Sequence, residues 1–331
     1  MPSRITALRP RLAVPGGRVT LEGGPFRVAH DAMPTVRLGN AVVRVQWASR
    51  TRIGLIVPQL EGGDVPIRIE EVPGETAFLH VGTLIATGVH QVDNPVVDRE
   101  GTVYLTFSGS RGQQAPVSIY RVPRGGAREV FVTGLTNPTS LAIGPDGGLY
   151  VSSRFDGAVY RVGEQGQVET VATELGVACG LAFAGDGTLY VGDRTGTIFR
   201  IPPGGDPAPF ATLPASVAAF HLAAAPDGGL FVAGPTLSPC DAVYHVSEAG
   251  AVTKLARTFG RPQGLAVDNA GRLHVVDALA GSSGVYRLDD QGQAELVVAG
   301  ADLIGLAFDP AGGAVVATSD SAYGFAPAAF A

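Results

Sequence analysis

Short apolar runs separated by glycine-rich turns recur through most of the chain. In each unit a short apolar run is followed by a tight turn that contains glycine, and then by a second apolar run, which is typical of a β-hairpin. One copy is looser than the other five. The copies are VDNPVVDREGTVYL from Val92, PTSLAIGPDGGLYV from Pro138, ACGLAFAGDGTLYV from Ala178, AFHLAAAPDGGLFV from Ala219, PQGLAVDNAGRLHV from Pro262 and LIGLAFDPAGGAVV from Leu303.

The second residue of each copy marks where the unit starts. These six marker positions are Asp93, Thr139, Cys179, Phe220, Gln263 and Ile304. Successive marker positions are 46, 40, 41, 43 and 41 residues apart. A period of this length accommodates four short strands, which is one blade of a β-propeller. The repeat therefore predicts an all-β protein that contains a six-bladed β-propeller.

The last unit is shorter than the others. It ends near Phe325, so it lacks a clear outer strand. Residues 81–87, VGTLIAT, precede the first unit and have the apolar character of a strand. We predict that this segment pairs with the last blade and closes the ring, because closure removes exposed sheet edges. The N-terminal segment is then expected to lie beside the last blade.

Residues 1–80 do not carry the repeat. Their short alternating runs predict a small immunoglobulin-like β-sandwich, which precedes a propeller over residues 81–331. The pieces ITALRPRLAVPGGRVTLEGGPF, VRLGNAVV and GGDVPIRI resemble the TIG (IPT) immunoglobulin-like domain. This resemblance implies a spacer or interaction module rather than a catalytic domain.

Composition narrows the classes of partner. Hydrophobic residues make up 45% of the chain and charged residues 16%, which excludes a disordered protein. The formal net charge is -6 and basic residues are scattered singly, so we expect neither a nucleic-acid nor a membrane partner. No signal peptide is visible at the N-terminus, so we expect a cytoplasmic protein, with export left open if the start was trimmed. The oligomeric state stays open.

The propeller segment resembles two related groups. The unit PQGLAVDNAGRLHVVDALAGSSGVYRL is similar to an NHL repeat, and residues 81–331 resemble the gluconolactonase-like (SGL) propellers. The second resemblance implies a lactonase or related hydrolase with one divalent cation, calcium or similar, at the channel mouth. Asp93 and Gln263 match its ligand positions with oxygen donors. Thr139 is a poor metal ligand, Cys179 is a soft one, and the other marker residues cannot coordinate a metal. The set of metal ligands that the resemblance implies is therefore incomplete.

Other polar residues near the marker positions have two readings each. A resemblance to streptogramin lyase-like propellers suggests His221 as a general base, and the alternative is a hydrogen-bonded residue that lines the channel. Asp93 and Asn94 could bind a ligand or could cap the first strand. Cys179 could be a nucleophile only with a stabilised thiolate, and a small buried side chain is the alternative.

Loops after the second strands add charged residues, namely Arg154, Asp193, Arg194 and Asp277. Asp–Arg pairs could orient an anionic ligand. Alternatively, they tie neighbouring blades together, as in NHL-type propellers. Two of these loops, residues 108–114 and 234–241, are longer than their counterparts, which often marks the binding face.

These observations favour a ligand- or protein-binding β-propeller whose site lies at the channel mouth. The candidate ligand-binding residues are Asp93, Asn94, Thr139, Cys179, Phe220, Gln263, Arg154, Asp193, Arg194 and Asp277. The alternative is a metal-dependent lactonase or esterase of the gluconolactonase type. Whether the protein is an enzyme stays open at this point, because a shared fold does not settle function.

Overall fold

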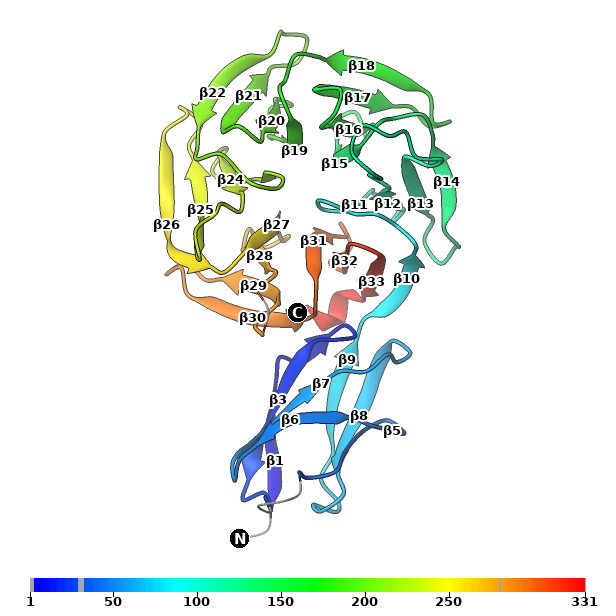
Figure 1. Ribbon diagram of the computed structural model, residues 1–331, viewed down its shortest axis with the longest axis vertical. Helices are drawn as coiled ribbons and strands as arrows, with labels where there is room; N and C mark the ends of the chain where they lie inside the picture. Colours follow the sequence, from blue (N-terminus) through cyan, green and yellow to red (C-terminus); the bar gives the residue numbers. More distant parts are fainter. Residues whose placement is uncertain (1–2, 29–32, 280, 331) are drawn as a thin grey trace.

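The computed structural model describes residues 3–28, 33–279 and 281–330. Within these residues the chain forms strands β1 to β33 and one short 3-10 helix, η1 (Pro327–Ala329). In the described part of the chain, no helix is long and apolar enough to cross a membrane. Figure 1 shows a ring of sheets with a smaller β-sandwich attached to one side.

The ring is a six-bladed β-propeller, as the repeat predicts, and each blade is a four-stranded antiparallel sheet. Blade 1 comprises β11 (Val96–Val97), β12 (Val103–Thr106), β13 (Ile119–Val122) and β14 (Glu129–Val132), blade 2 comprises β15 (Pro138–Ile143), β16 (Leu149–Ser153), β17 (Ala158–Val162) and β18 (Val168–Ala172), and blade 3 comprises β19 (Ala178–Phe183), β20 (Leu189–Asp193), β21 (Thr197–Ile201) and β22 (Ala208–Thr212). Blade 4 comprises β23 (His221–Ala224), β24 (Leu230–Ala233), β25 (Asp241–Val246) and β26 (Val252–Phe259), blade 5 comprises β27 (Pro262–Val267), β28 (Leu273–Asp277), β29 (Gly284–Leu288) and β30 (Ala294–Ala299), and blade 6 comprises β31 (Leu303–Phe308), β32 (Ala314–Thr318), β33 (Ser321–Phe325) and β10 (Thr83–Thr87).

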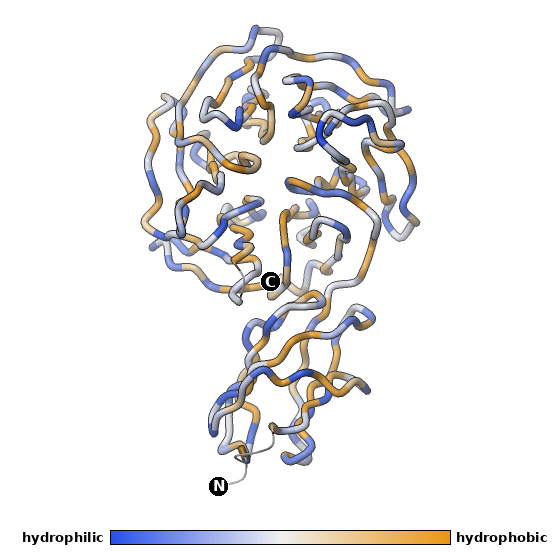
Figure 2. Tube along the Cα trace, in the orientation of Figure 1, coloured by the Kyte–Doolittle hydropathy of each residue, from blue (hydrophilic) through white to orange (hydrophobic). Residues whose placement is uncertain are grey.

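The outer strand of blade 6 comes from the start of the propeller segment. Strand β10 pairs antiparallel with β33, with Thr83 opposite Gly324 and Thr87 opposite Ser321. The predicted closure of the ring is therefore confirmed. Apolar clusters fill the spaces between blades, and Figure 2 shows hydrophobic positions alternating with hydrophilic ones along the strands. This alternation buries one set of side chains against the neighbouring blade.

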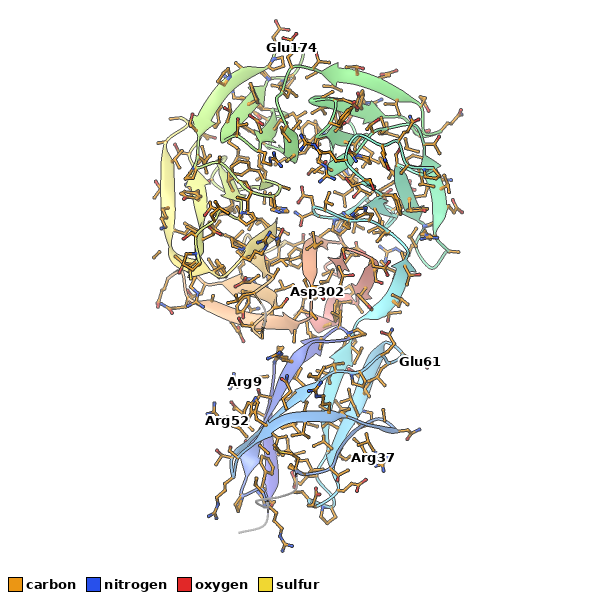
Figure 3. The ribbon with its side chains drawn as sticks, viewed as in Figure 1. Arg9, Arg37, Arg52, Glu61, Glu174 and Asp302 are labelled. Carbon is orange, nitrogen blue, oxygen red and sulfur yellow. The ribbon has the colours of Figure 1, made fainter. Side chains whose placement is uncertain are left out.

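The N-terminal segment folds as two facing sheets. One consists of β1 (Arg4–Arg9), β3 (Arg18–Gly24), β7 (Arg52–Ile56) and β6 (Arg44–Ala48), and the other of β9 (Ala77–Val81), β8 (Gly63–Ile69), β4 (Val36–Leu38) and β5 (Ala41–Val42). Leu21, Ile53 and Ile67 are fully buried between them, whereas Arg9 and Arg52 are exposed on the outside (Figure 3). The likeness to immunoglobulin-like TIG domains and the division at residues 80 and 81 stay predictions.

The sandwich and the ring share backbone hydrogen bonds. Strand β2 (Leu12–Ala13) runs parallel to β30 on one side and to β9 on the other, so the second sheet of the sandwich continues into blade 5. Leu12 and Val14 also pack against Leu303 and Phe325 of blade 6. The sandwich therefore lies beside the last blade, as expected, and is also joined by strand pairing to blade 5.

Candidate functional site

All the marker positions lie at one face of the ring, which we call the mouth face. The innermost strands begin there, and the antiparallel second strands end there. In blade 2, for example, Pro138 at the start of β15 lies opposite Ser153 at the end of β16. The loops that follow the second strands therefore surround the channel entrance, as a ligand site on a propeller requires.

Three polar residues from different blades meet inside the channel, and we call them the channel triad: Asp93, His221 and Gln263. His221 Nδ1 lies 2.5 Å from Asp93 Oδ1, and its Nε2 lies 3.2 Å from Gln263 Oε1. The His221 side chain is 0% exposed and that of Asp93 is 2% exposed. Because Asp93 belongs to blade 1 and His221 to blade 4, this pair joins opposite sides of a six-bladed ring.

The pair forms because blade 1 departs from the pattern of the others. Its inner strand, β11, has only two residues, and the segment before it, residues 91–95, crosses toward blades 5 and 6 (Figure 1). Asn94 Nδ2 donates to Leu265 O at 2.7 Å, and Asn94 Oδ1 accepts from Leu306 N at 3.0 Å. Asn94 is therefore bound to backbone groups of two facing strands.

A residue that the sequence analysis did not single out holds this crossing segment. Gln91 is fully buried. Its Oε1 accepts from Thr106 N at 2.8 Å, and its Nε2 donates to Asp93 O at 2.9 Å. Its position two residues before a marker residue is the only signal in the sequence. Gln91 fixes the backbone at Asp93 and thereby the position of the Asp93 carboxylate.

The remaining marker candidates offer few polar atoms to a ligand. Thr139 is buried and its hydroxyl donates to Asn137 O at 3.0 Å. Phe220 is 2% exposed and packs in the core between blades 3 and 4. Cys179 is also buried, and burial raises the pKa of its thiol to about 12. The thiol stays protonated at neutral pH, so the reading of Cys179 as a small buried side chain fits the geometry.

Asp193 and Asp277 use their carboxylates within the protein. Asp193 Oδ1 accepts from Val177 N at 2.8 Å. Asp277 accepts from Gly260 N at 3.0 Å and from Arg261 N at 2.8 Å. Each carboxylate thus fastens the loop that leads into an inner strand to the end of the adjacent second strand. These hydrogen bonds hold the entry loop of the same blade, rather than tying neighbouring blades together as the alternative interpretation expected.

Arg154 and Arg194 differ from these carboxylates because their guanidinium groups have no partner among the residues that the structure describes. Neither side chain takes part in an ion pair or donates a hydrogen bond there, and Arg154 Nε is buried. Burial lowers the pKa of Arg154 below its usual value, and the positive charges of Arg111 and Arg194 lower it further. Arg111, which the sequence analysis noted only as part of a long loop, therefore belongs to the same region.

These residues do not fit the divalent cation that the gluconolactonase-like resemblance implies. Asp93 Oδ1 and Gln263 Oε1, from the two residues expected to bind a cation, are in contact with His221. Both polar atoms of the Asn94 amide are bound to backbone, and Cys179 holds its proton. Among residues 3–28, 33–279 and 281–330, no group of three or more His, Cys, Asp or Glu side chains could hold a metal ion. A hard divalent cation needs several oxygen ligands.

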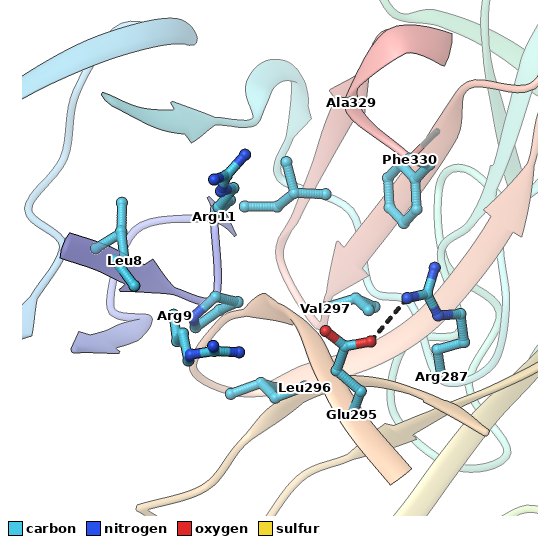
Figure 4. A pocket seen from close by; sticks show the side chains of 12 residues that line it. Leu8, Arg9, Arg11, Arg287, Glu295, Leu296, Val297, Ala329 and Phe330 are labelled. Atoms are coloured by element: carbon cyan, nitrogen blue, oxygen red, sulfur yellow. Dashed lines mark hydrogen bonds and ion pairs between the residues drawn. The ribbon is translucent and has the colours of Figure 1, made fainter. Parts of the chain in front are cut away.

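A second hollow lies away from the channel, between the sandwich and blade 5. This groove has a volume of about 430 Å³ and is lined by residues such as Arg11, Leu296 and Phe330. The ion pair between Arg287 and Glu295, at 2.7 Å, lies on the blade 5 side of the groove (Figure 4). No residue of the channel triad and no candidate from the sequence lies in the lining of this groove.

Comparison with solved structures shows the fold. It is a β-propeller. The chain is similar to an auxiliary nutrient binding protein from Bacteroides ovatus, with 12% identity, a TM-score of 0.57 and 98% of each chain covered. It is also similar to a gluconolactonase from Xanthomonas campestris, with 17% identity and a TM-score of 0.60 over 73% of this chain and 88% of that one. A catalytically inactive virginiamycin B lyase from Staphylococcus aureus, solved with quinupristin, aligns with 14% identity and a TM-score of 0.54 over 93% of this chain and 98% of that one.

The sequence comparisons gave no closer relation. No family model matches the chain, and no curated protein matches it. At these identities the solved structures show the shared propeller architecture alone, and both binding proteins and lactonases use it.

Proposed function

We propose that this chain is a small-molecule-binding β-propeller that takes its ligand at the mouth face and does not hydrolyse it. The observation that carries the proposal is the channel triad. It places a residue from each of three blades in the channel and engages the donors that a metal-dependent hydrolase would need there. A general base must also reach the proton that it removes, and His221 has no exposed side-chain atoms and both ring nitrogens in contact with protein groups.

One of the comparisons is consistent with binding. The auxiliary nutrient binding protein aligns over 98% of this chain, sandwich included, but the virginiamycin B lyase also aligns over 93% of it, so coverage alone does not separate binding from catalysis. The two-part architecture is thus shared with a protein named for binding. We place the ligand of this chain among small molecules, because the mouth face lies at the convergence of the blades.

The alternative, a metal-dependent lactonase, has one observation in its favour. A histidine whose Nδ1 contacts a carboxylate is the arrangement that orients a catalytic base. For His221 to act in this way, its contact with Gln263 must open and water must enter the channel. Catalysis by His221 would therefore require a rearrangement of the channel triad.

A turnover assay tests the proposal. Hydrolysis of D-glucono-1,5-lactone is followed by acid release with calcium, magnesium, manganese or zinc added in turn. We expect no turnover above the buffer rate with any cation. Cation-dependent turnover that is lost in a folded His221→Gln variant would overturn the binding function and establish the lactonase.

A further inference from the structure

Two neighbouring blades place an arginine at the same structural position on the mouth face. Arg154 follows β16 and donates its backbone N–H to Asn137 O at 3.3 Å, and Arg194 follows β20 and donates to Val177 O at 3.1 Å. Asn137 and Val177 are the residues that precede the inner strands of blades 2 and 3. The corresponding positions in blades 4 and 5 are Gly234 and Ala278.

Asn137 brings a third arginine to the same place. This residue has a left-handed φ of 47°. Its Oδ1 accepts from Gly112 N at 2.7 Å, and its Nδ2 donates to Ser108 O and Ser110 O at 2.6 and 2.9 Å. The long loop of blade 1, which carries Arg111 next to Gly112, is therefore anchored on the residue that also holds the Arg154 backbone.

Hydrogen bonding and packing hold this arrangement together. Ser152 Oγ donates to Cys179 O at 2.5 Å, which joins blade 2 to blade 3 beneath Arg154 and Arg194. The exposed Phe155 lies against the blade 1 loop, since a Cβ at Gly112 would lie 3.0 Å from its ring. The guanidinium groups are thus carried by elements that are fixed to one another.

The charges of these arginines are uncompensated in the described part of the protein. Elsewhere on the propeller, Arg121, Arg161 and Arg287 pair with carboxylates at 2.7 to 2.9 Å. Neither Asp93 nor Asp156 forms an ion pair with these arginines; Asp93 Oδ1 contacts His221, and Asp156 accepts from the hydroxyls of Ser153 and Tyr160. Gathering like charges at a partly buried place costs free energy unless a counter-charge is bound there.

We propose that Arg111, Arg154 and Arg194 together bind an oxyanion group, a carboxylate, sulfate or phosphate, of the small ligand. The planar guanidinium matches the geometry of such groups with two parallel hydrogen bonds. Phe155 supplies an apolar surface beside them, which suits a ligand whose body is aromatic or otherwise partly apolar. This inference rests on the proposed function, because it names the chemical class of the ligand at the same face.

The experiment uses inorganic sulfate as the probe on the full chain. The thermal unfolding midpoint is measured against sulfate at constant ionic strength, balanced with sodium chloride. We expect a saturable rise for the wild type and for the control Arg121→Gln, whose arginine pairs with Glu129 on the outer strands of blade 1. In Arg154→Gln the apparent affinity should fall at least tenfold. Equal responses in the wild type and Arg154→Gln, or no sulfate-specific rise in the wild type, would overturn the inference.

A second pair of measurements covers a failure of Arg154→Gln to fold and identifies the anion. Arg194→Gln should weaken sulfate binding several-fold, and an unchanged affinity would overturn the inference. Calorimetric titrations with benzoate, phenyl phosphate and neutral benzamide then separate carboxylate from phosphate ligands. Benzamide binding as tightly as both anions would also overturn it. Lactone turnover would instead contradict the proposed function and leave the sulfate result standing, so the two failures are distinguishable.

Discussion

Removal of the Asp93 carboxylate should destabilise the propeller more than removal of an exposed carboxylate. The Asp93 and His221 side chains are 2% and 0% exposed and meet at 2.5 Å. Deleting one partner of a buried hydrogen-bonded pair costs about 1–3 kcal/mol, because the other partner is left without a hydrogen-bond acceptor. With about 2 °C per kcal/mol for a large domain, Asp93→Ala should lower the unfolding midpoint by roughly 2–6 °C.

The same chain offers a matched control for this change. Asp227 and His245 also form a pair, at 3.0 Å, but the Asp227 side chain is 62% exposed. Exposed pairs contribute about 1 kcal/mol or less, so Asp227→Ala should shift the midpoint by about 2 °C or less. Asp93→Asn, which preserves the shape of the side chain, should fall between the two.

Thermal unfolding followed by circular dichroism or calorimetry measures these shifts, and a double-mutant cycle isolates the interaction. We expect a coupling of about 2 kcal/mol between Asp93→Ala and His221→Ala, because each residue loses its main partner in the single variants. Equal midpoints for Asp93→Ala and Asp227→Ala, or strictly additive effects of the two channel substitutions, would refute the cross-channel pair as a source of stability.

Three further predictions concern pH, packing and thiol reactivity. Burial lowers the pKa of His274 from 6.5 to about 4. As the pH falls, the unfolded chain therefore binds this proton before the folded chain does, so up to about 3 kcal/mol of stability present above pH 6.5 should be lost toward pH 4. A His274→Gln variant with the same pH dependence as the wild type in denaturant titrations would contradict this. Gly305→Ala would place a Cβ 2.7 Å from Asp93 O and should lower the free energy of unfolding by about 1–3 kcal/mol. In the control Gly185→Ala, the new Cβ meets no atom within 4 Å, so the unfolding midpoint should stay nearly unchanged. Similar midpoints for the two variants would argue against the tight crossing of residues 91–95. Ellman's reagent at pH 8 should modify one thiol per folded chain, at exposed Cys240. Rapid modification of two thiols would contradict the burial and the raised pKa of Cys179.

The blades could be predicted from the sequence because their signals are local. Each unit combines an apolar run, a turn that contains Asp or Asn with Gly, and a second apolar run within about 14 residues, so the hairpin is encoded by neighbouring residues. The closing strand was also predictable, since an incomplete last unit and a spare strand before the first one fit together. These inferences need only the order of the elements around a ring.

The channel triad could not be derived in the same way. His221 and Asp93 are 128 residues apart and begin blades on opposite sides of the ring. The marker positions of opposite blades are expected to face each other across an open channel, not to touch. Contact depends on the short β11 and on the crossing of Asn94 to blades 5 and 6, and neither has a periodic signal.

The hydrogen-bond partners of the charged loop residues could not be predicted from the sequence either. Arg154, Asp193, Arg194 and Asp277 lie at or just after the ends of second strands, and the sequence left either a ligand site or ties between neighbouring blades open for all of them. The structure separates the two kinds. The carboxylates accept backbone hydrogen bonds, whereas the two arginines find no such acceptor in the described residues.

The metal content of the purified protein decides whether the mouth face binds its ligand without a catalytic cation. The full chain is dialysed against a chelator-free buffer that contains calcium, magnesium, manganese and zinc, and bound metal is then measured by mass spectrometry for the wild type and for Asp93→Asn. We expect far less than one metal ion per chain in both proteins. About one ion per wild-type chain that is lost in folded Asp93→Asn would contradict this expectation.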